Sequence, residues 1–283
     1  MIRSMLYVPA SSERFISRAH ERGADAIILD LEDSVVPEEK EKARSGLSEA
    51  VRSVRRTGAT VFVRVNSLED LILADAEAAC RAGAFGLLVP KVNDPGTLTR
   101  LEKLLEAIEG EIARREKTVL VPLIEDPGAV FDARAIAGAT PRVFGVMTGG
   151  EDLCTVMGAD PIPEVVRFPT LLVHLAAKAA GVLSFGLLRS VADYRDLEGI
   201  TRAAREARTF GFDGASCVHP QVVPILNEAF SPSAEEIARA ARLIAAYDAA
   251  QTAGKGACVF EGKMIDVPVV QRARALLARQ SGR

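Results

Sequence analysis

The stretch Thr60-Val-Phe-Val-Arg-Val65 is a short, mostly apolar run, and Gly86-Leu-Leu-Val-Pro90 repeats the pattern after a helix-like segment. Short apolar runs bounded by polar or turn residues are typical of buried parallel strands. The other runs of this kind are Met5–Pro9, Ala26–Leu31, Val119–Ile124, Val143–Thr148, Val182–Phe185 and Gly214–Val218. The sequence therefore predicts eight buried strands.

Longer amphipathic segments separate these runs. They cover Ser11–Arg22, Pro37–Arg56, Leu68–Ala82, Thr97–Arg115, Gly128–Ala137, Val165–Ala180 and Tyr194–Phe210. Parallel strands need crossover connections, which are usually helices, so regular alternation predicts a parallel α/β fold. Eight such units favour a (β/α)8 TIM barrel, and a doubly wound open sheet is the alternative.

The pattern changes after the eighth run. Helices are predicted at Pro220–Ala229 and Ser233–Ala253, the second opened by a Ser-x-x-Glu capping box. A short apolar run, Met264-Ile-Asp266 and a last helix at Pro268–Arg279 follow. We predict a barrel domain over residues 1–230 and a C-terminal helical extension over residues 231–283. The extension is expected to pack on the barrel or on a neighbouring subunit.

The composition excludes several classes of protein. The 283 residues are 48% hydrophobic and 26% charged, which excludes a largely disordered chain. A net charge of −3 argues against nucleic-acid binding, and the apolar runs are too short for a membrane span. The four scattered Cys residues form no CxxC pair, so we expect reduced thiols in a cytoplasmic protein.

Charged side chains follow most of the predicted strands. In a (β/α)8 barrel, chemistry takes place where the strands end. One such residue alone is usually a solvated loop residue or a helix cap, but repetition over several strands favours a functional site there. The residues in question are Asp30, Glu32, Asp33, Arg64, Lys91, Glu125, Asp152 and His219.

Glu125 and Asp152 are the candidate metal ligands. Two carboxylates from adjacent strands form an oxygen-rich site, and Mg²⁺ is typically held by one or two carboxylates plus waters or substrate oxygens. The three His residues lie too far apart in the sequence for a zinc site. Mg²⁺ is therefore the expected ion, with Mn²⁺ as the alternative.

Arg64 and Lys91 supply positive charge beside these acids. They either balance a buried ion network or stabilise a carboxylate, carbonyl or developing enolate oxygen of a substrate, and both roles are compatible. His219 has two open interpretations, substrate contact and helix capping. No Walker loop, dinucleotide-binding GxGxxG or GxSxG elbow occurs.

Seven stretches occur in an order that carries a family resemblance. They are Arg3-Ser-Met-Leu-Tyr-Val-Pro9, Leu29-Asp-Leu-Glu-Asp-Ser-Val35, Val63-Arg-Val-Asn66, Val89-Pro-Lys91, Leu123-Ile-Glu125, Gly150-Glu-Asp-Leu153 and Val218-His-Pro-Gln221. Together they resemble the citrate lyase beta-chain-like family, which includes malyl-CoA and citramalyl-CoA lyases. The resemblance spans nearly the whole chain. It implies a (β/α)8 barrel, Mg²⁺ dependence and assembly as a homotrimer or homohexamer.

The resemblance also implies roles for single residues. Glu125 and Asp152 match the metal-binding carboxylates of the family, and Arg64 matches its substrate-binding arginine. Glu32 and Asp33 match acids near the metal waters and that arginine. The Met264-Ile-Asp266 segment resembles an element whose aspartate is supplied to the neighbouring subunit as an acid/base. The resulting assignment is catalysis by Asp266, Arg64 and Asp33, and substrate binding by Arg64, Glu125, Glu32, Lys91 and His219.

The resemblance implies an enzyme, a carbon–carbon lyase. It would cleave a 3-hydroxyacyl-CoA of the malyl, citramalyl or citryl type into acetyl-CoA and a 2-oxo acid by reversible Claisen chemistry. Its partners would be acyl-CoA and 2-oxo acid small molecules. The alternatives are a malyl-CoA-type thioesterase, a citrate lyase beta subunit acting on a carrier-protein thioester, and a non-catalytic acyl-CoA binder. Asp126 replaces the usual Thr of the family and is expected to add negative charge beside the metal.

Overall fold

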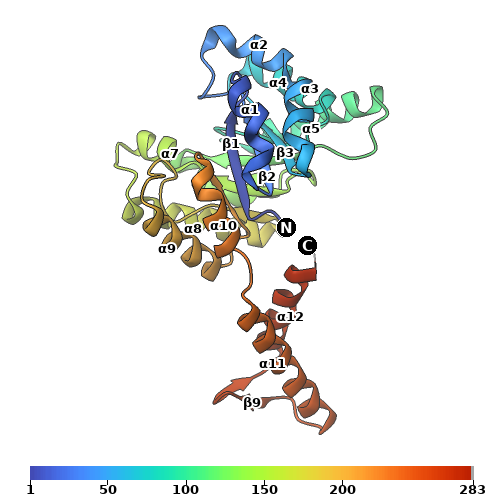
Figure 1. Cartoon of the computed structure of the whole chain (residues 1–283), viewed down its shortest axis with the longest axis vertical. Helices are drawn as coiled ribbons and strands as arrows, with labels where there is room; N and C mark the ends of the chain where they lie inside the picture. The colour runs from blue at the N-terminus through green and yellow to red at the C-terminus, as the bar shows by residue number, and fades with distance from the viewer. Residues whose placement is uncertain (282–283) are drawn as a thin grey trace. The chain divides into compact units, whose positions relative to one another are not determined.

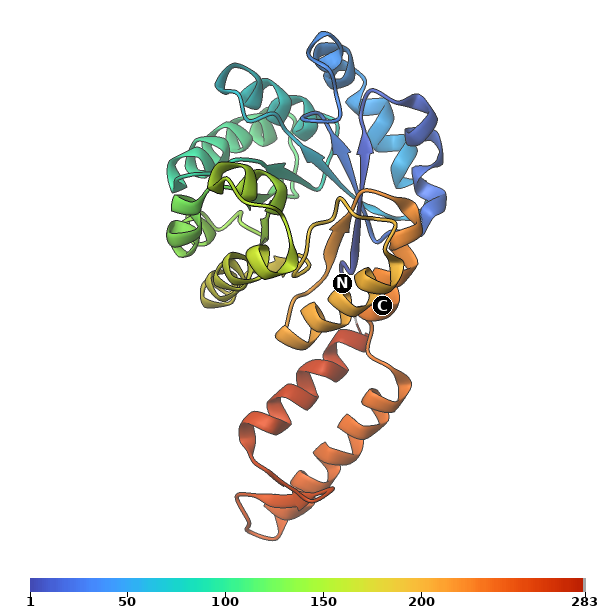
Figure 2. The ribbon, with the colours of Figure 1, turned by 90° about the vertical axis from the view of Figure 1, so that its left-hand side faces the viewer.

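The computed structural model describes residues 1–281 and contains a nearly closed barrel of eight parallel strands surrounded by helices (Figures 1 and 2). The strand order is β7-β6-β5-β4-β3-β2-β1-β8. The predicted (β/α)8 barrel is confirmed, and the open-sheet alternative is wrong. The strands are β1 (Ser4–Pro9), β2 (Ala26–Asp30), β3 (Thr60–Arg64), β4 (Gly86–Val89), β5 (Val119–Ile124), β6 (Gly145–Thr148), β7 (Leu183–Phe185) and β8 (Ala215–Cys217).

The helices of the barrel lie in the connections between strands and, in the case of α10, after β8. Those with α-helical geometry are α1 (Glu13–Ala19), α2 (Lys40–Ser45), α3 (Leu47–Val54), α4 (Glu69–Arg81), α5 (Pro95–Glu111), α6 (Pro127–Ala137), α7 (Gly150–Met157), α8 (Pro163–Ala180), α9 (Leu197–Phe210) and α10 (Val223–Ala229). The prediction of one helix over Pro37–Arg56 was wrong. Gly46 separates α2 from α3, because glycine is a poor residue for a helix interior. Short 3₁₀ segments flank the pair at Pro37–Glu39 and Arg55–Thr57.

Strand alternation divides the apolar side chains into two layers. Met5, Ile28 and Phe62 belong to the core inside the barrel, whereas Leu6 and Ile27 belong to the larger core between strands and helices. Phenylalanines fill the barrel interior. Phe85 lies edge-to-face against both Phe62 and Phe144, with ring centroids 5.4 Å apart in each pair. The interior is therefore a packed core, as is usual for this fold.

Residues 231–281 belong to a second compact unit, separate from residues 2–230. It contains α11 (Ala234–Thr252), the antiparallel hairpin of β9 (Cys258–Phe260) and β10 (Lys263–Ile265), and α12 (Val267–Ser281). Its own small core includes Leu243, Tyr247, Ile265 and Val270. The capping box at Ser233 and Glu236 is present. The hairpin was not predicted, and its two turn residues, Glu261 and Gly262, both have positive φ.

None of the helices in residues 1–281 combines the length and the apolar character that a membrane span requires.

Candidate active site

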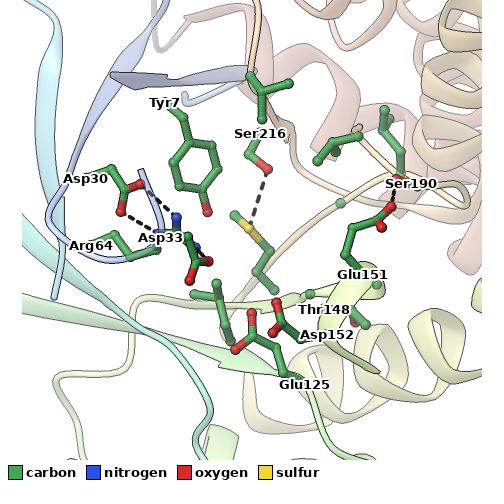
Figure 3. A pocket seen from close by; sticks show the side chains of 18 of the residues that line it. Tyr7, Asp30, Asp33, Arg64, Glu125, Thr148, Glu151, Asp152, Ser190 and Ser216 are labelled. Carbon is green, nitrogen blue, oxygen red and sulfur yellow. Dashed lines mark hydrogen bonds and ion pairs between the residues drawn. The ribbon is translucent and has the colours of Figure 1, made fainter. Parts of the chain in front are cut away.

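A cavity of about 460 Å³ lies at the carboxyl ends of the barrel strands (Figure 3). Along β2, β3 and β5, every second residue faces the barrel interior. At the carboxyl end of each of these strands, the next position in this alternation holds a polar residue. Ile28 is followed by Asp30, Phe62 by Arg64, and Leu123 by Glu125. The polar residues that line the cavity include Tyr7, Asp30, Asp33, Ser34, Arg64, Glu125, Thr148, Asp152 and Ser216.

Arg64 is clamped by acids from the neighbouring strand and loop. Strand register places it directly opposite Asp30. Arg64 Nε donates to Asp30 Oδ1 at 2.6 Å, and Nη2 donates to Oδ2 at 2.7 Å. Nη1 lies 2.9 Å from Glu32 Oε2 and 3.0 Å from Asp33 Oδ2. Such a bidentate pair fixes the plane of the guanidinium as well as its position.

Asp30 is a strand-end residue to which the sequence assigned no role in the site. It is 2% exposed, and it also accepts hydrogen bonds from the Glu32 amide and the Ser34 hydroxyl. Burial raises the pKa of the Asp30 carboxyl, but the hydrogen bonds and charge of Arg64 outweigh burial and hold it below its usual range. Strand alternation is the signal that could have placed Asp30 in the cavity, since Ile28 two residues earlier faces the barrel interior.

Lys40 holds the loop that carries Glu32 from behind. Its ammonium donates to the backbone carbonyls of Leu31 and Glu32, each at 2.9 Å, and to Asn66 Oδ1. Asn66 is fixed in turn, because its amide and side chain both donate to the buried carboxylate of Asp75. All three ammonium protons therefore have acceptors, which fits a structural use of this charge.

Lys91 contacts three of the acids at the site. Its backbone has φ +53°, a conformation that is uncommon outside glycine. In this conformation its amide donates to Glu125 Oε2 at 2.7 Å. Its Nζ lies 3.3 Å from Glu32 Oε1 and 3.7 Å from Asp152 Oδ1. Lys91 thus offsets part of the negative charge with both its backbone and its side chain.

Glu125 is 4% exposed and has carboxylates for neighbours. Burial, together with the charges of Asp152 and Glu32, raises its pKa to about 7, although the Lys91 amide and Arg64 oppose the shift. Burial and Asp33 also raise the pKa of Glu32, against Arg64 and Lys91. Gly149 makes room for Glu125, because a Cβ there would lie 2.7 Å from Glu125 Cδ.

These residues fit a divalent cation bound through few protein ligands. Within residues 1–281, no group of three or more His, Cys, Asp or Glu is arranged to hold a metal by itself. Glu125 and Asp152 offer carboxylate oxygens, and the buried Thr148 hydroxyl in the same cavity has no hydrogen-bond partner. A site with two carboxylates and room for water or substrate oxygens suits Mg²⁺ better than zinc.

The other predicted site residues make local contacts of their own. His219 does not line the cavity: its Nδ1 accepts from the Gln221 amide at 3.3 Å, and its ring stacks on Tyr194. Asp266 belongs to the C-terminal unit, where its Oδ1 accepts from the Val269 amide at 3.4 Å. Asp126 does not line the cavity. Its side chain caps α6, accepting from the amides of Gly128 and Ala129.

The fold and the cavity define a (β/α)8 barrel with a carboxylate-rich site, suited to a divalent cation, at the carboxyl ends of its strands. Residues 3–220 match the HpcH/HpaI aldolase/citrate lyase family, and the chain belongs to that family.

Two similar curated proteins carry different activities in their names. The chain is 33% identical to the citrate lyase subunit beta of Escherichia coli strain K12, over 98% of this chain and 92% of that protein. It is 34% identical to a (3S)-malyl-CoA thioesterase of Cereibacter sphaeroides, over 98% of this chain and 94% of the other. Both likenesses extend through the barrel and the C-terminal unit.

A similar solved structure contains ligands. It is the protein CitE from Mycobacterium tuberculosis in complex with magnesium, acetoacetate and coenzyme A. The TM-score is 0.77 at 30% identity, and the likeness covers 98% of this chain and 97% of that one. Magnesium is thus bound in a structural relative of this chain.

Proposed function

We propose that the protein is a Mg²⁺-dependent carbon–carbon lyase. It cleaves a 3-hydroxyacyl-CoA thioester of the malyl, citramalyl or citryl type into acetyl-CoA and a 2-oxo acid. The observation that carries this proposal is that a clamped arginine and the carboxylates of Glu125 and Asp152 line one cavity. When bound by Glu125 and Asp152, Mg²⁺ supplies a Lewis acid for the substrate's hydroxyl and carboxylate oxygens.

The cleavage requires two proton transfers and one site for negative charge. The hydroxyl proton leaves as the bond between C2 and C3 breaks, and the hydroxyl carbon becomes the carbonyl of the 2-oxo acid. The bonding electrons form the enolate of acetyl-CoA, which then takes a proton at carbon. Asp33, whose side chain is 58% exposed beside Arg64, is the carboxylate we assign to accept the hydroxyl proton. Arg64 stabilises the enolate oxygen, and Asp266 supplies the proton at carbon.

The assignment of Asp266 implies an oligomer. We propose a homotrimer or homohexamer in which one subunit supplies Asp266 to the barrel of another, with Glu32 and Lys91 orienting the acyl group.

We also propose a cytoplasmic location, in keeping with four cysteines that are all free thiols in the structure.

The test is a cleavage assay with purified protein on malyl-CoA, citramalyl-CoA and citryl-CoA, with Mg²⁺ and with EDTA. Formation of acetyl-CoA and a 2-oxo acid that stops with EDTA supports the proposal and names the substrate. Metal-independent cleavage contradicts the metal assignment. Glu125→Ala is expected to abolish the Mg²⁺-dependent rate.

Thioester hydrolysis is the second candidate, supported by the 34% identity to a (3S)-malyl-CoA thioesterase. In that reaction water attacks the acyl carbon, and the products are free CoA and the hydroxy acid. The same assay separates the two functions, because only hydrolysis releases the hydroxy acid. Activity confined to a carrier-protein thioester would instead match the relatives named citrate lyase subunit beta.

A further inference from the structure

We propose that the Tyr7 hydroxyl is a second hydrogen-bond donor, beside Arg64, for the substrate oxygen that gains negative charge. This inference rests on the proposed lyase function and deepens it by adding a catalytic residue.

Tyr7 reaches the cavity through the alternation of β1. Met5 lies in the core inside the barrel, and Tyr7 packs against that core two residues later, whereas Leu6 and Val8 pack outward against the helices. Strand register places Tyr7 opposite Ile28, two residues before Asp30. Tyr7 lines the cavity, and Figure 3 shows its hydroxyl directed into it.

The Tyr7 ring lies against the guanidinium of Arg64. Arg64 Cζ is 5.1 Å from the ring centroid, so the ring packs on the guanidinium as a cation–π pair. The packing requires only the ring, and a phenylalanine would supply it equally well. Among residues 1–281 the hydroxyl has no hydrogen-bond partner, so neither packing nor internal bonding accounts for it.

The hydroxyl is a donor at neutral pH. Burial and the charges of Asp30, Glu125 and Glu32 raise the pKa of Tyr7 well above its usual range, with Arg64 opposing. The phenol therefore keeps its proton. In a cavity already crowded with carboxylates, a neutral donor holds a developing oxyanion without adding another charge.

Arg64 by itself has few hydrogen-bond donors left for a substrate oxygen, so a second donor is useful. Asp30, Glu32 and Asp33 together engage four of its N–H groups. One N–H on Nη2 remains for a substrate. Oxyanion sites commonly combine more than one donor, and Tyr7 is the neighbouring group that supplies the second. Both residues keep their protons throughout, and the enolate carbon takes its proton from Asp266.

The experiment compares Tyr7→Phe with wild type in the cleavage assay with Mg²⁺. We expect kcat to fall by about a hundredfold, the usual effect of losing one oxyanion donor. KM should stay nearly constant, because the interaction strengthens only as charge develops. Tyr194→Phe, which alters a ring that does not line the cavity, is the matched control and should keep wild-type kcat. Thermal unfolding of both variants checks the fold.

Two kinetic outcomes overturn the proposal. Wild-type kcat in Tyr7→Phe removes the donor role, and a raised KM with unchanged kcat reduces Tyr7 to ordinary substrate binding. If the wild type cleaves none of the thioesters, the proposed lyase function has failed separately. Tyr7 is then judged by calorimetric titration with acetyl-CoA in the presence of Mg²⁺, because acetyl-CoA carries the thioester oxygen in question. Weaker binding to Tyr7→Phe than to wild type supports a donor to a bound oxygen, and equal binding or none overturns it.

Discussion

Burial and two neighbouring carboxylates raise the pKa of Glu125 to about 7, against an ordinary value of 4.5. In the metal-free protein the folded state therefore favours the protonated acid. The stability that Glu125 contributes is complete below pH 4.5 and is lost as the pH rises through 7. A shift of this size corresponds to roughly 3 kcal/mol in the free energy of unfolding.

Glu125→Gln tests this sign, because the amide does not ionise. We expect the variant to be more stable than wild type at pH 8 without divalent metal, and the difference to shrink at pH 5. Urea denaturation of both proteins at the two pH values, in EDTA, measures it. A stability difference that does not change with pH would contradict the assignment of a raised pKa to this carboxyl.

The affinity for Mg²⁺ should also change with the ionisation of Glu125, but it should rise with pH, whereas the stability of the metal-free protein falls. A metal ligand must be ionised, so binding becomes tighter as the pH rises toward 7 and levels off above it. Isothermal titration of wild type with MgCl₂ at several pH values measures the trend. Affinity independent of pH between 5.5 and 8 would argue against Glu125 as a ligand.

Gly149 is a residue whose lack of a side chain can be tested directly. An added Cβ would overlap the carboxylate of Glu125, so Gly149→Ala should displace that group and weaken Mg²⁺ binding by about tenfold or more. Gly150→Ala is the matched control. Its Cβ would come no closer than 3.4 Å to Val166, a contact that a small shift accommodates. Equal Mg²⁺ affinities in the two variants would contradict the steric argument.

Single residues were predictable from the sequence when a strand end placed them. Arg64, Glu125 and Asp152 are close to predicted strand ends, and all three line the cavity. The role of Lys91 could not be predicted in full. Its amide reaches Glu125 only because its φ is positive, and the sequence pattern does not indicate a positive φ at this position. Tyr7 was hidden because a tyrosine in a strand looks like an ordinary core residue.

At the scale of elements, the segment from β2 to α2 positions the Glu32 loop through Lys40. Lys40→Met removes the three hydrogen bonds that the ammonium makes. We expect turnover to fall about tenfold, while Mg²⁺ affinity stays within about threefold of wild type because Glu125 and Asp152 are untouched. Lys42→Met, in the same helix but exposed, is the control. Equal turnover in the two variants would show that the loop holds its position without Lys40.

Elements were predictable where hydrophobic periodicity is strong. The run Thr60–Val65 differs from β3 by one residue, since a buried parallel strand is apolar on both faces. The C-terminal hairpin has strands of only three residues each, and β9 exposes Val259 while β10 exposes Met264. Runs of three residues are too short to show the alternating hydrophobic pattern of a strand, so only helices were predicted in the extension.

At the scale of the whole molecule, the two compact units divide the proposed chemistry. Glu125 belongs to the barrel, and Asp266 belongs to the C-terminal unit with its own core. Asp266→Asn is expected to leave Mg²⁺ affinity nearly unchanged and to lower turnover by about a hundredfold or more. Near-normal turnover would remove Asp266 from the mechanism.

Mixing two inactive variants tests whether Asp266 acts between subunits. When Asp266→Asn and Glu125→Gln chains are co-expressed, a site can combine an intact barrel from one chain with an intact Asp266 from the other. Random assembly would make about a quarter of the sites intact in this way, so substantial activity should return. Each variant expressed alone is the control. Hybrid oligomers that remain inactive would place Asp266 within its own subunit.

β7 and β8, the two end strands of the sheet order, meet in a short contact, which we call the β7–β8 join. β7 and β8 have three residues each, and a single bridge between Phe185 and Gly214 connects them, whereas β1 and β2 pair over five positions. Gly186, Leu187, Ser216 and Val218 line the cavity on either side of this join. Widening the mouth there would break few backbone hydrogen bonds. We therefore expect this part of the barrel wall to tolerate changes in the size of a bound acyl chain, whereas Asp30 and Arg64 lie on strands that pair over five positions.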